Sequence, residues 1–174
     1  MDDWPEIVAQ HGEAVWQAAF RVLGNEADAA DCVQETFAAA VKLARREPIR
    51  NWAALLRRVG NMQALGMLRQ RSRRRKHYEG TKTPEIPDPG PGPAEQAQTY
   101  ESAQALRRAL ARLPEQQAAV FTLRYLEDLS YEQIAETLGL SSSGVGVLLH
   151  RAKGKLRHLM LARPAPKQAE VQHD

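Results

Sequence analysis

Arginine and lysine side chains form the largest concentrations of chemically active groups in this sequence. Residues 57–76 contain eight bases and no acid, and residues 150–163 contain five bases and no acid. A polyanion relieves the self-repulsion of such clusters, because binding releases its counterions. The two stretches therefore predict nucleic-acid binding, although a basic run can also be a solvated helix end or a linker. The bases are Arg57, Arg58, Arg69, Arg71, Arg73, Arg74, Arg75 and Lys76, then Arg151, Lys153, Lys155, Arg157 and Arg163.

The N-terminal part of the chain carries the opposite charge. Residues 1–44 contain eight acids and two bases, and Asp31 and Glu35 stand four residues apart, on one face of a predicted helix. Two such carboxylates suggest a catalytic pair, but no third group or metal-ligating histidine lies nearby in the sequence. The histidines are scattered, at His11, His77, His150, His158 and His173. We therefore expect no catalytic site, no metal and no cofactor, and the partner of the acidic face stays open.

Composition limits the class of protein. The chain has 174 residues, of which 43% are hydrophobic and 26% charged, which is typical of one medium or two small globular domains. No apolar run approaches the roughly 18 residues of a membrane span, and the acidic start MDDWPE differs from a signal peptide. The single cysteine, Cys32, excludes an internal disulfide and a cysteine-based zinc site. We expect a reduced, cytoplasmic protein without membrane insertion.

A proline-rich segment divides the chain. Five of the ten residues from Pro84 to Pro93 are proline, and proline cannot donate to a regular hydrogen-bond ladder. We interpret residues 79–98 as a flexible linker between two small helical domains, 1–78 and 99–162. The tail, 163–174, has no apolar pattern, and no alternating strand pattern of useful length occurs. The predicted fold class is all-α.

Three helices are predicted in residues 1–78. Gly24 suits the left-handed position at a helix end, and Asn25 and Asn51 are good N-caps for the second and third helices. Trp16 and Phe20 form an i,i+4 pair. The predicted inward residues are Val8, Val15, Ala19 and Val22 in the first helix, Ala30, Val33, Phe37, Ala40, Val41 and Ala44 in the second, and Trp52, Leu55, Leu56, Val59 and Met62 in the third.

Four helices are predicted in residues 99–162, and the last two have helix-turn-helix spacing over residues 131–150. Ser130 and Gln133 form a capping-box pattern, in which each side chain satisfies a free amide at the helix start. Gly139 stands where the turn needs a positive φ, and Val145 packs the second helix onto the first. This arrangement places the second helix where it can enter a major groove. A plain helical hairpin is the alternative interpretation.

Three segments together resemble a known family. LPEQQAAVFTLRYLEDLSYEQIAETLGLSSSGVGVLLHRAKGKLR resembles the minus-35-binding C-terminal domain of bacterial sigma factors of the extracytoplasmic-function (ECF) type, within the sigma-70 family. LGNEADAADCVQETFAAAV is similar to their helix that docks on core RNA polymerase. NWAALLRRVGNMQALGMLRQRSRRR is similar to the helix that opens and recognises the minus-ten element. The resemblance spans about residues 4–160, in the order of the family.

The resemblance implies a role for each surface. Core polymerase would contact Asp31, Gln34 and Glu35. The resemblance places minus-ten DNA at Trp52, Asn61, Arg69, Arg71, Arg73, Arg74 and Arg75. It places minus-35 DNA at Ser141, Ser142, Ser143, Val147, His150, Arg151 and Lys153. The implied partners are core polymerase, promoter DNA and an anti-sigma factor, with no small-molecule substrate. Such a protein is not an enzyme, because the polymerase supplies the catalysis.

The sequence departs from the family where bases would be recognised. Family members carry a Thr-Val-Lys-Ser-Arg-like stretch where this chain has residues 144–148, GVGVL. Gly146 and Val147 offer no donors or acceptors to base edges. We expect this domain to depend on backbone phosphates, with Val147 against thymine methyl groups. In the minus-ten segment, Leu65 replaces a common acid, and Arg69 lies out of register by one residue.

Two functions from other classes remain as alternatives. A stand-alone helix-turn-helix regulator would use the same C-terminal domain, but should bind a palindrome as a dimer and leaves residues 25–45 without a role. A protein that binds polymerase or an anti-sigma factor without recognising promoters fits the depleted recognition helix. Core-polymerase binding and direct DNA binding separate the three.

Overall fold

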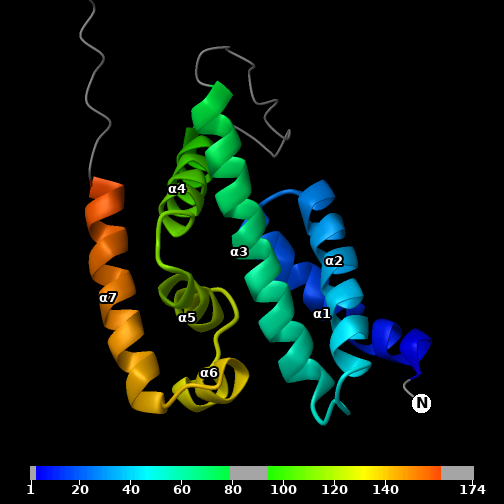
Figure 1. Ribbon diagram of the computed structural model, residues 1–174. Helices are drawn as coiled ribbons and strands as arrows, with labels where there is room; N and C mark the ends of the chain where they lie inside the picture. Colours follow the sequence, from blue (N-terminus) through cyan, green and yellow to red (C-terminus); the bar gives the residue numbers. More distant parts are fainter. Residues whose placement is uncertain (1–2, 79–93, 162–174) are drawn as a thin grey trace, which may run out of the picture.

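The computed structural model describes residues 3–78 and 94–161, and this part of the chain is entirely helical, without strands (Figure 1). The predicted all-α class is confirmed. None of the described helices is both long and apolar enough to cross a membrane. The helices are α1 (Trp4–Leu23), α2 (Glu26–Ala44), α3 (Trp52–Tyr78), α4 (Ala94–Leu110), α5 (Glu115–Tyr125), α6 (Tyr131–Leu138) and α7 (Ser142–Leu161).

Local signals determine the ends of the first three helices. Gly24 ends α1 with φ of 78°, a left-handed conformation that costs glycine little. Asn25 then caps α2, because its side-chain oxygen accepts from the Asp28 amide at 2.8 Å. Asn51 caps α3 in the same way through the Ala54 amide at 2.9 Å. These three predictions are confirmed.

The buried faces of α1 and α2 differ from the prediction at two positions. Val8 is 44% exposed, and Ala30 is exposed as well. Since α2 packs against both α1 and α3, its buried strip follows Ala29, Cys32 and Thr36 at helical spacing, and Ala30 lies one residue outside it. On α1 the neighbouring Ile7 is buried in place of Val8.

The helix-turn-helix forms at α6 and α7, as predicted. Ser130 and Gln133 make both hydrogen bonds of the capping box, and Gly139 turns the chain with φ of 67°. Ile134, Val145 and Leu149 are fully or almost fully buried in a core that α5 completes. The geometry of α6 and α7 therefore follows directly from the local sequence.

The predicted boundaries of the C-terminal half need correction. Helix α4 begins at Ala94, inside the predicted linker 79–98. The rest of the predicted linker, 79–93, and the tail from residue 162 lie outside the described residues.

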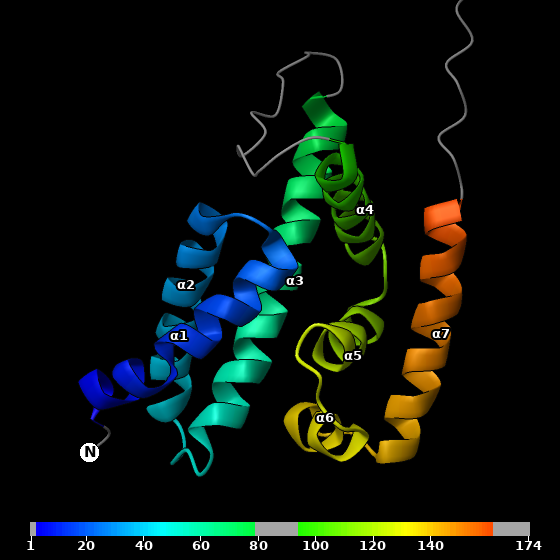
Figure 2. The same ribbon diagram turned by 180° about the vertical axis from the view of Figure 1, so that it is seen from behind.

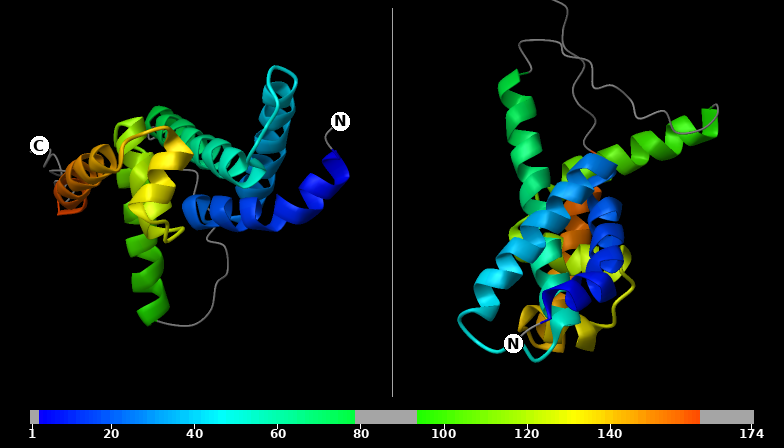
Figure 3. Two further views of the ribbon diagram at one scale, coloured as in Figure 1. Left: turned by 90° about the horizontal axis from the view of Figure 1, so that it is seen from below. Right: turned by 90° about the vertical axis from the view of Figure 1, so that its right-hand side faces the viewer.

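One hydrophobic core crosses between the two halves. Leu65 and Leu68 of α3 belong to the same buried cluster as Leu110, Leu113 and Ala118. Helix α3 lies between α1 and α2 on one side and α4 to α7 on the other (Figures 1 and 2). The end of α3 and the beginning of α4 project in different directions (Figure 3). The central part of α3 is therefore the element on which both halves pack.

Candidate nucleic-acid interface

The last turns of α3 carry the first basic surface. Arg73, Arg74 and Arg75 are exposed, and so is Arg71, whose guanidinium lies 3.6 Å from the Asp28 carboxylate. These four predicted DNA-binding residues therefore lie together at one end of the helix. The concentration of positive charge on a projecting helix suits contact with backbone phosphates.

Arg69 lies apart from this basic surface. Its side chain is only 20% exposed, and its Nη1 lies 3.9 Å from Glu115 Oε2 of α5. Because the guanidinium faces the C-terminal half, the structure does not group Arg69 with the four exposed arginines of α3. Trp52, which the family resemblance also places at the minus-ten element, is half-buried and packs edge-to-face on Trp4, with ring centroids 5.1 Å apart.

Asn61 is buried, contrary to what a DNA-contacting residue needs. It is 3% exposed, and its amide Nδ2 donates to Thr122 Oγ1 of α5 at 2.7 Å. The contact joins α3 to the C-terminal half across 61 residues of sequence. In this conformation Asn61 is therefore part of the contact between the two halves and not of the exposed surface.

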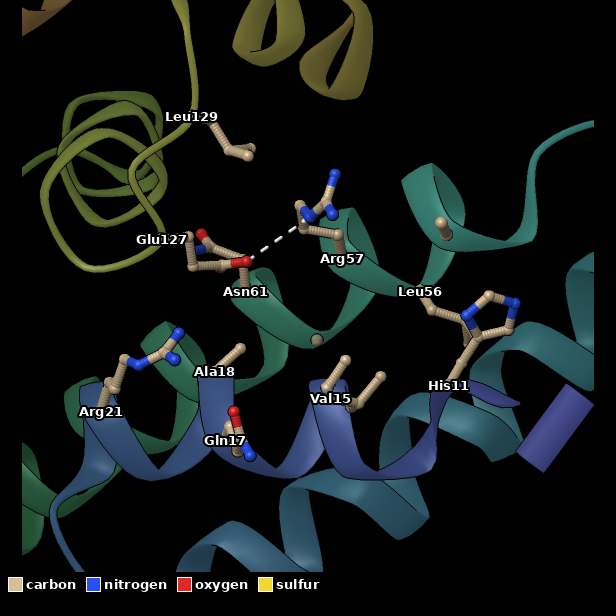
Figure 4. A pocket seen from close by; sticks show the side chains of 13 residues that line it. His11, Val15, Gln17, Ala18, Arg21, Leu56, Arg57, Asn61, Glu127 and Leu129 are labelled. Carbon is tan, nitrogen blue, oxygen red and sulfur yellow. Dashed lines mark ion pairs between the residues drawn. The ribbon is translucent and has the colours of Figure 1, made fainter. Parts of the chain in front are cut away.

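A cavity of about 290 Å³ lies beside Asn61, between α1, α3 and the segment after α5 (Figure 4). Arg57 Nε approaches Glu127 Oε2 at 3.5 Å across it. Burial raises the pKa of the Glu127 carboxyl above its ordinary value, while Arg57, Arg21 and a hydrogen bond from Asn61 act in the opposite direction. The cavity therefore contains a carboxylate whose charge is disfavoured by its surroundings.

The second basic surface lies along α7, with three serines at the start of the helix and the cations from its middle onward. Ser141, Ser142 and Ser143 are exposed, and Ser141 Oγ accepts from the Gly144 amide at 3.1 Å, so this hydroxyl also caps the helix. Val147 is 50% exposed. His150, Arg151 and Lys153 are exposed along the same helix, so the predicted minus-35 residues lie on α7 and at the residue just before it.

Two tyrosines next to this surface were not singled out from the sequence. Tyr131 is 40% exposed and lies beside α7, where a Cβ at Gly146 would be in ordinary contact with its ring, 3.5 Å away. Arg124 lies 5.9 Å from the centroid of the Tyr131 ring, and Lys153 lies 5.9 Å from that of Tyr125.

The acidic face of α2 lies opposite its buried strip. Asp31, Gln34 and Glu35 are all exposed, as a protein-binding surface requires. The neighbouring Cys32 points inward, where burial raises the pKa of its thiol to about 11. Within the described residues, no three His, Cys, Asp or Glu side chains are arranged to hold a metal ion.

Comparisons with known proteins agree with the division of the chain into an N-terminal and a C-terminal half. Residues 7–74 match the model of sigma-70 region 2, and residues 103–156 match that of sigma-70, region 4. The chain is 32% identical over 157 residues to the ECF RNA polymerase sigma factor SigE of Mycolicibacterium smegmatis, covering 90% of this chain and 61% of SigE. It is 30% identical over 162 residues to the RNA polymerase sigma factor CnrH of Cupriavidus metallidurans, covering 89% of this chain and 85% of CnrH.

Two solved structures have a similar fold. One is CnrH in complex with the cytosolic domain of CnrY, with a TM-score of 0.53, 27% identity, and coverage of 92% of this chain and 88% of that one. The other is the sigma factor RpoE of Bartonella quintana with the anti-sigma factor NepR, with a TM-score of 0.53, 22% identity, and coverage of 94% and 100%. With both halves matched in order, the chain belongs to the sigma-70 family of RNA polymerase sigma factors, in its ECF group.

Proposed function

We propose that this protein binds core RNA polymerase in the cytoplasm and directs it to a set of promoters. The observation that carries the proposal is the separation of two exposed basic surfaces, at the end of α3 and from the middle of α7 onward, each within a different sigma-70 region. A promoter with two spaced elements needs two such surfaces. The protein supplies recognition and strand opening, and the polymerase supplies the chemistry.

The acidic face of α2 is the proposed contact with core polymerase. Asp31, Gln34 and Glu35 are exposed on consecutive turns, and neither carboxylate takes part in an ion pair among the described residues. Exposed carboxylates keep their hydration until a partner replaces it, so they favour a basic surface on the polymerase. Charge reversal of Asp31 and Glu35 together tests this assignment.

The helix-turn-helix is the proposed contact with the minus-35 element. Its exposed groups are the serine hydroxyls at the start of α7, the apolar Val147 and the cations that follow. Hydroxyls and cations bind phosphates, and an apolar side chain contacts thymine methyl groups. We therefore expect recognition that depends more on the DNA backbone and on A·T pairs than on guanine.

An anti-sigma factor is the proposed regulatory partner. The fold neighbours RpoE and CnrH were solved with NepR, an anti-sigma factor, and with the cytosolic domain of CnrY, respectively. This chain aligns with both structures over more than nine tenths of its length, and we expect a partner of the same kind to compete with polymerase for it.

The deciding experiment is in vitro transcription with core polymerase and a genomic promoter library, with and without the protein. New start sites that share two spaced elements support the proposal. The Asp31→Lys/Glu35→Lys variant should lose core binding, while Glu13→Lys, which reverses an exposed carboxylate on α1, should retain it. Core binding without new starts would favour an interaction protein, and DNA binding without core binding would favour a stand-alone regulator.

A further inference from the structure

We propose that the cavity between α1, α3 and the segment after α5 is a binding site for a small organic acid, a ligand that carries one carboxylate on an apolar body. Its volume of about 290 Å³ is at the small end of the roughly 300–1,000 Å³ that ligand pockets occupy. The cavity also lies where the N-terminal and C-terminal halves meet, and ligand pockets occur preferentially at such boundaries. The inference goes beyond the proposed function, because no step of it involves polymerase or DNA.

The walls of the cavity suit the apolar body of such a ligand. Ala14 and Ala18 stand four residues apart on α1 and both line the cavity, so the space that longer side chains would fill is open. The buried part of the lining is aliphatic, since Val15, Leu56 and Leu129 are 6%, 1% and 7% exposed. A ligand placed against these side chains would remove apolar surface from water, and this burial favours binding.

Arg21 gives the cavity a cation outside any ion pair. Its side chain extends from α1 toward Glu127 (Figure 4), and none of the ion pairs in the described part of the chain includes it. The second arginine of the lining, Arg57, already pairs with Glu127 at 3.5 Å. Two guanidinium groups therefore face one carboxyl. Because a guanidinium binds a carboxylate through two parallel hydrogen bonds, this excess of positive charge favours a carboxylate ligand.

The surroundings of Glu127 favour the same ligand charge. The Glu127 side chain is 12% exposed, and burial raises the pKa of its carboxyl, while Arg57, Arg21 and a hydrogen bond from Asn61 lower it. A bound anion would raise this pKa further, because a neighbouring like charge disfavours ionisation. The protonated carboxyl then has a hydrogen to donate to the ligand. His11 lines the other end of the cavity, and an ammonium ligand would meet both guanidinium groups.

Three ligands of similar shape test the charge that the site accepts. Phenylacetate, phenethylamine and phenylethanol share an apolar body and carry a carboxylate, an ammonium and a hydroxyl group. Each is titrated into the full-length protein at pH 8, and isothermal titration calorimetry gives its dissociation constant. We expect phenylacetate to bind about tenfold more tightly than phenylethanol, because hydrogen bonds between charged groups are stronger than neutral ones, and phenethylamine to bind least. Tighter binding of phenethylamine, or no saturable binding of phenylacetate, would overturn the inference.

Two pairs of variants locate the ligand on the protein. Arg21→Gln removes the cation of the cavity, whereas Arg45→Gln removes an exposed arginine at the end of α2 that does not line it. Ala14→Leu lengthens a side chain of the lining, whereas Ala30→Leu makes the same change at an exposed alanine of α2. Since Ala14 is itself exposed, a leucine at this position leaves the core intact. Thermal unfolding of each variant shows whether it folds.

We expect Arg21→Gln and Ala14→Leu each to weaken phenylacetate binding about tenfold, while their controls leave it unchanged. Glu127→Gln should tighten binding, because it removes the one carboxylate that competes for the two arginines. Equal affinities within either pair of variants, or weaker binding to Glu127→Gln, would overturn the inference. The calorimetry contains neither polymerase nor DNA, so its failure is distinguishable from a failure of the proposed function.

Discussion

The guanidinium of Arg107 occupies the space next to Gly24 that a side chain at this glycine would need. A Cβ at Gly24 would overlap the guanidinium carbon and nitrogens, and Nε of Arg107 donates to the Val22 carbonyl at 3.1 Å. The C-terminal carbonyls of a helix lack partners within the helix and carry partial negative charge. The left-handed turn at Gly24 is therefore also the point where α4 contacts α1, through the side chain of Arg107.

This relationship predicts that Gly24→Ala is more destabilising than Gly139→Ala. Both glycines have positive φ, 78° and 67°, so each alanine costs roughly 1 kcal/mol for the left-handed conformation. Only Gly24 has Arg107 against it, while nothing lies within 4 Å of a Cβ at Gly139. We expect about 1 kcal/mol more loss for Gly24→Ala, because a hydrogen bond from a charged group is displaced. Urea denaturation measures both, and equal losses would show that Arg107 moves aside without cost.

The partly buried carboxyl of Glu127 predicts an unusual pH dependence of stability. Its pKa is raised from 4.5 by burial, so the folded protein holds this proton to higher pH than the unfolded chain does. The group therefore favours folding below pH 4.5, and this contribution is lost as the pH rises through the raised value. Arg57 and Arg21 face the carboxyl, and His11 lines the same cavity.

Glu127→Gln isolates this effect, because it keeps the shape of the side chain without its charge. We expect the variant to be more stable than the unsubstituted protein at pH 7 to 8, and the difference to disappear as the pH falls towards 4.5. Thermal unfolding at a series of pH values measures the difference. A variant that is less stable at pH 8 would mean that the ion pair with Arg57 outweighs the burial of the charge.

The exposed arginines at the end of α3 predict a change in salt dependence. Replacement of Arg73, Arg74 and Arg75 together by alanine should reduce the slope of log K against log salt by about 2 to 3 for DNA binding. The matched control replaces three exposed arginines near the connection from α2 to α3, namely Arg45, Arg46 and Arg50. Titration of a labelled DNA at several salt concentrations measures the slope. An unchanged slope in the first variant would remove these arginines from the interface.

Local signals in the sequence were sufficient to predict where helices begin and end, but not to predict the contact between the N-terminal and C-terminal halves. Asn25, Asn51 and Ser130 make their capping bonds because N-capping depends on residues within one turn. The burial of Asn61 depends on Thr122, which is 61 residues away, and no periodicity contains that information. Val8 and Ala30 were misplaced for a related reason, since the packing of three helices decides which of two adjacent residues faces inward.

Replacement of Gly146, near the start of α7, by a cationic residue should increase the affinity for DNA. In Gly146→Lys the first side-chain carbon would lie in ordinary contact with the Tyr131 ring, 3.5 Å away, so the remaining chain extends from the helix beside the exposed Val147. Helix propensity alone should stabilise the protein by up to about 1 kcal/mol. The added cation should raise affinity for promoter DNA and increase the salt slope by about 1.

Gly154→Lys is the matched control for this substitution. Gly154 lies on the same helix, is exposed and has nothing within 4 Å of a Cβ, so its replacement makes the same change in charge and propensity two turns further along α7. We expect similar gains in thermal stability from the two variants, but a larger gain in promoter affinity from Gly146→Lys. If both raise affinity equally, charge anywhere on α7 is sufficient, and the start of the helix does not enter the groove. If only Gly154→Lys does so, the DNA lies along the later turns, next to Lys153 and Arg157.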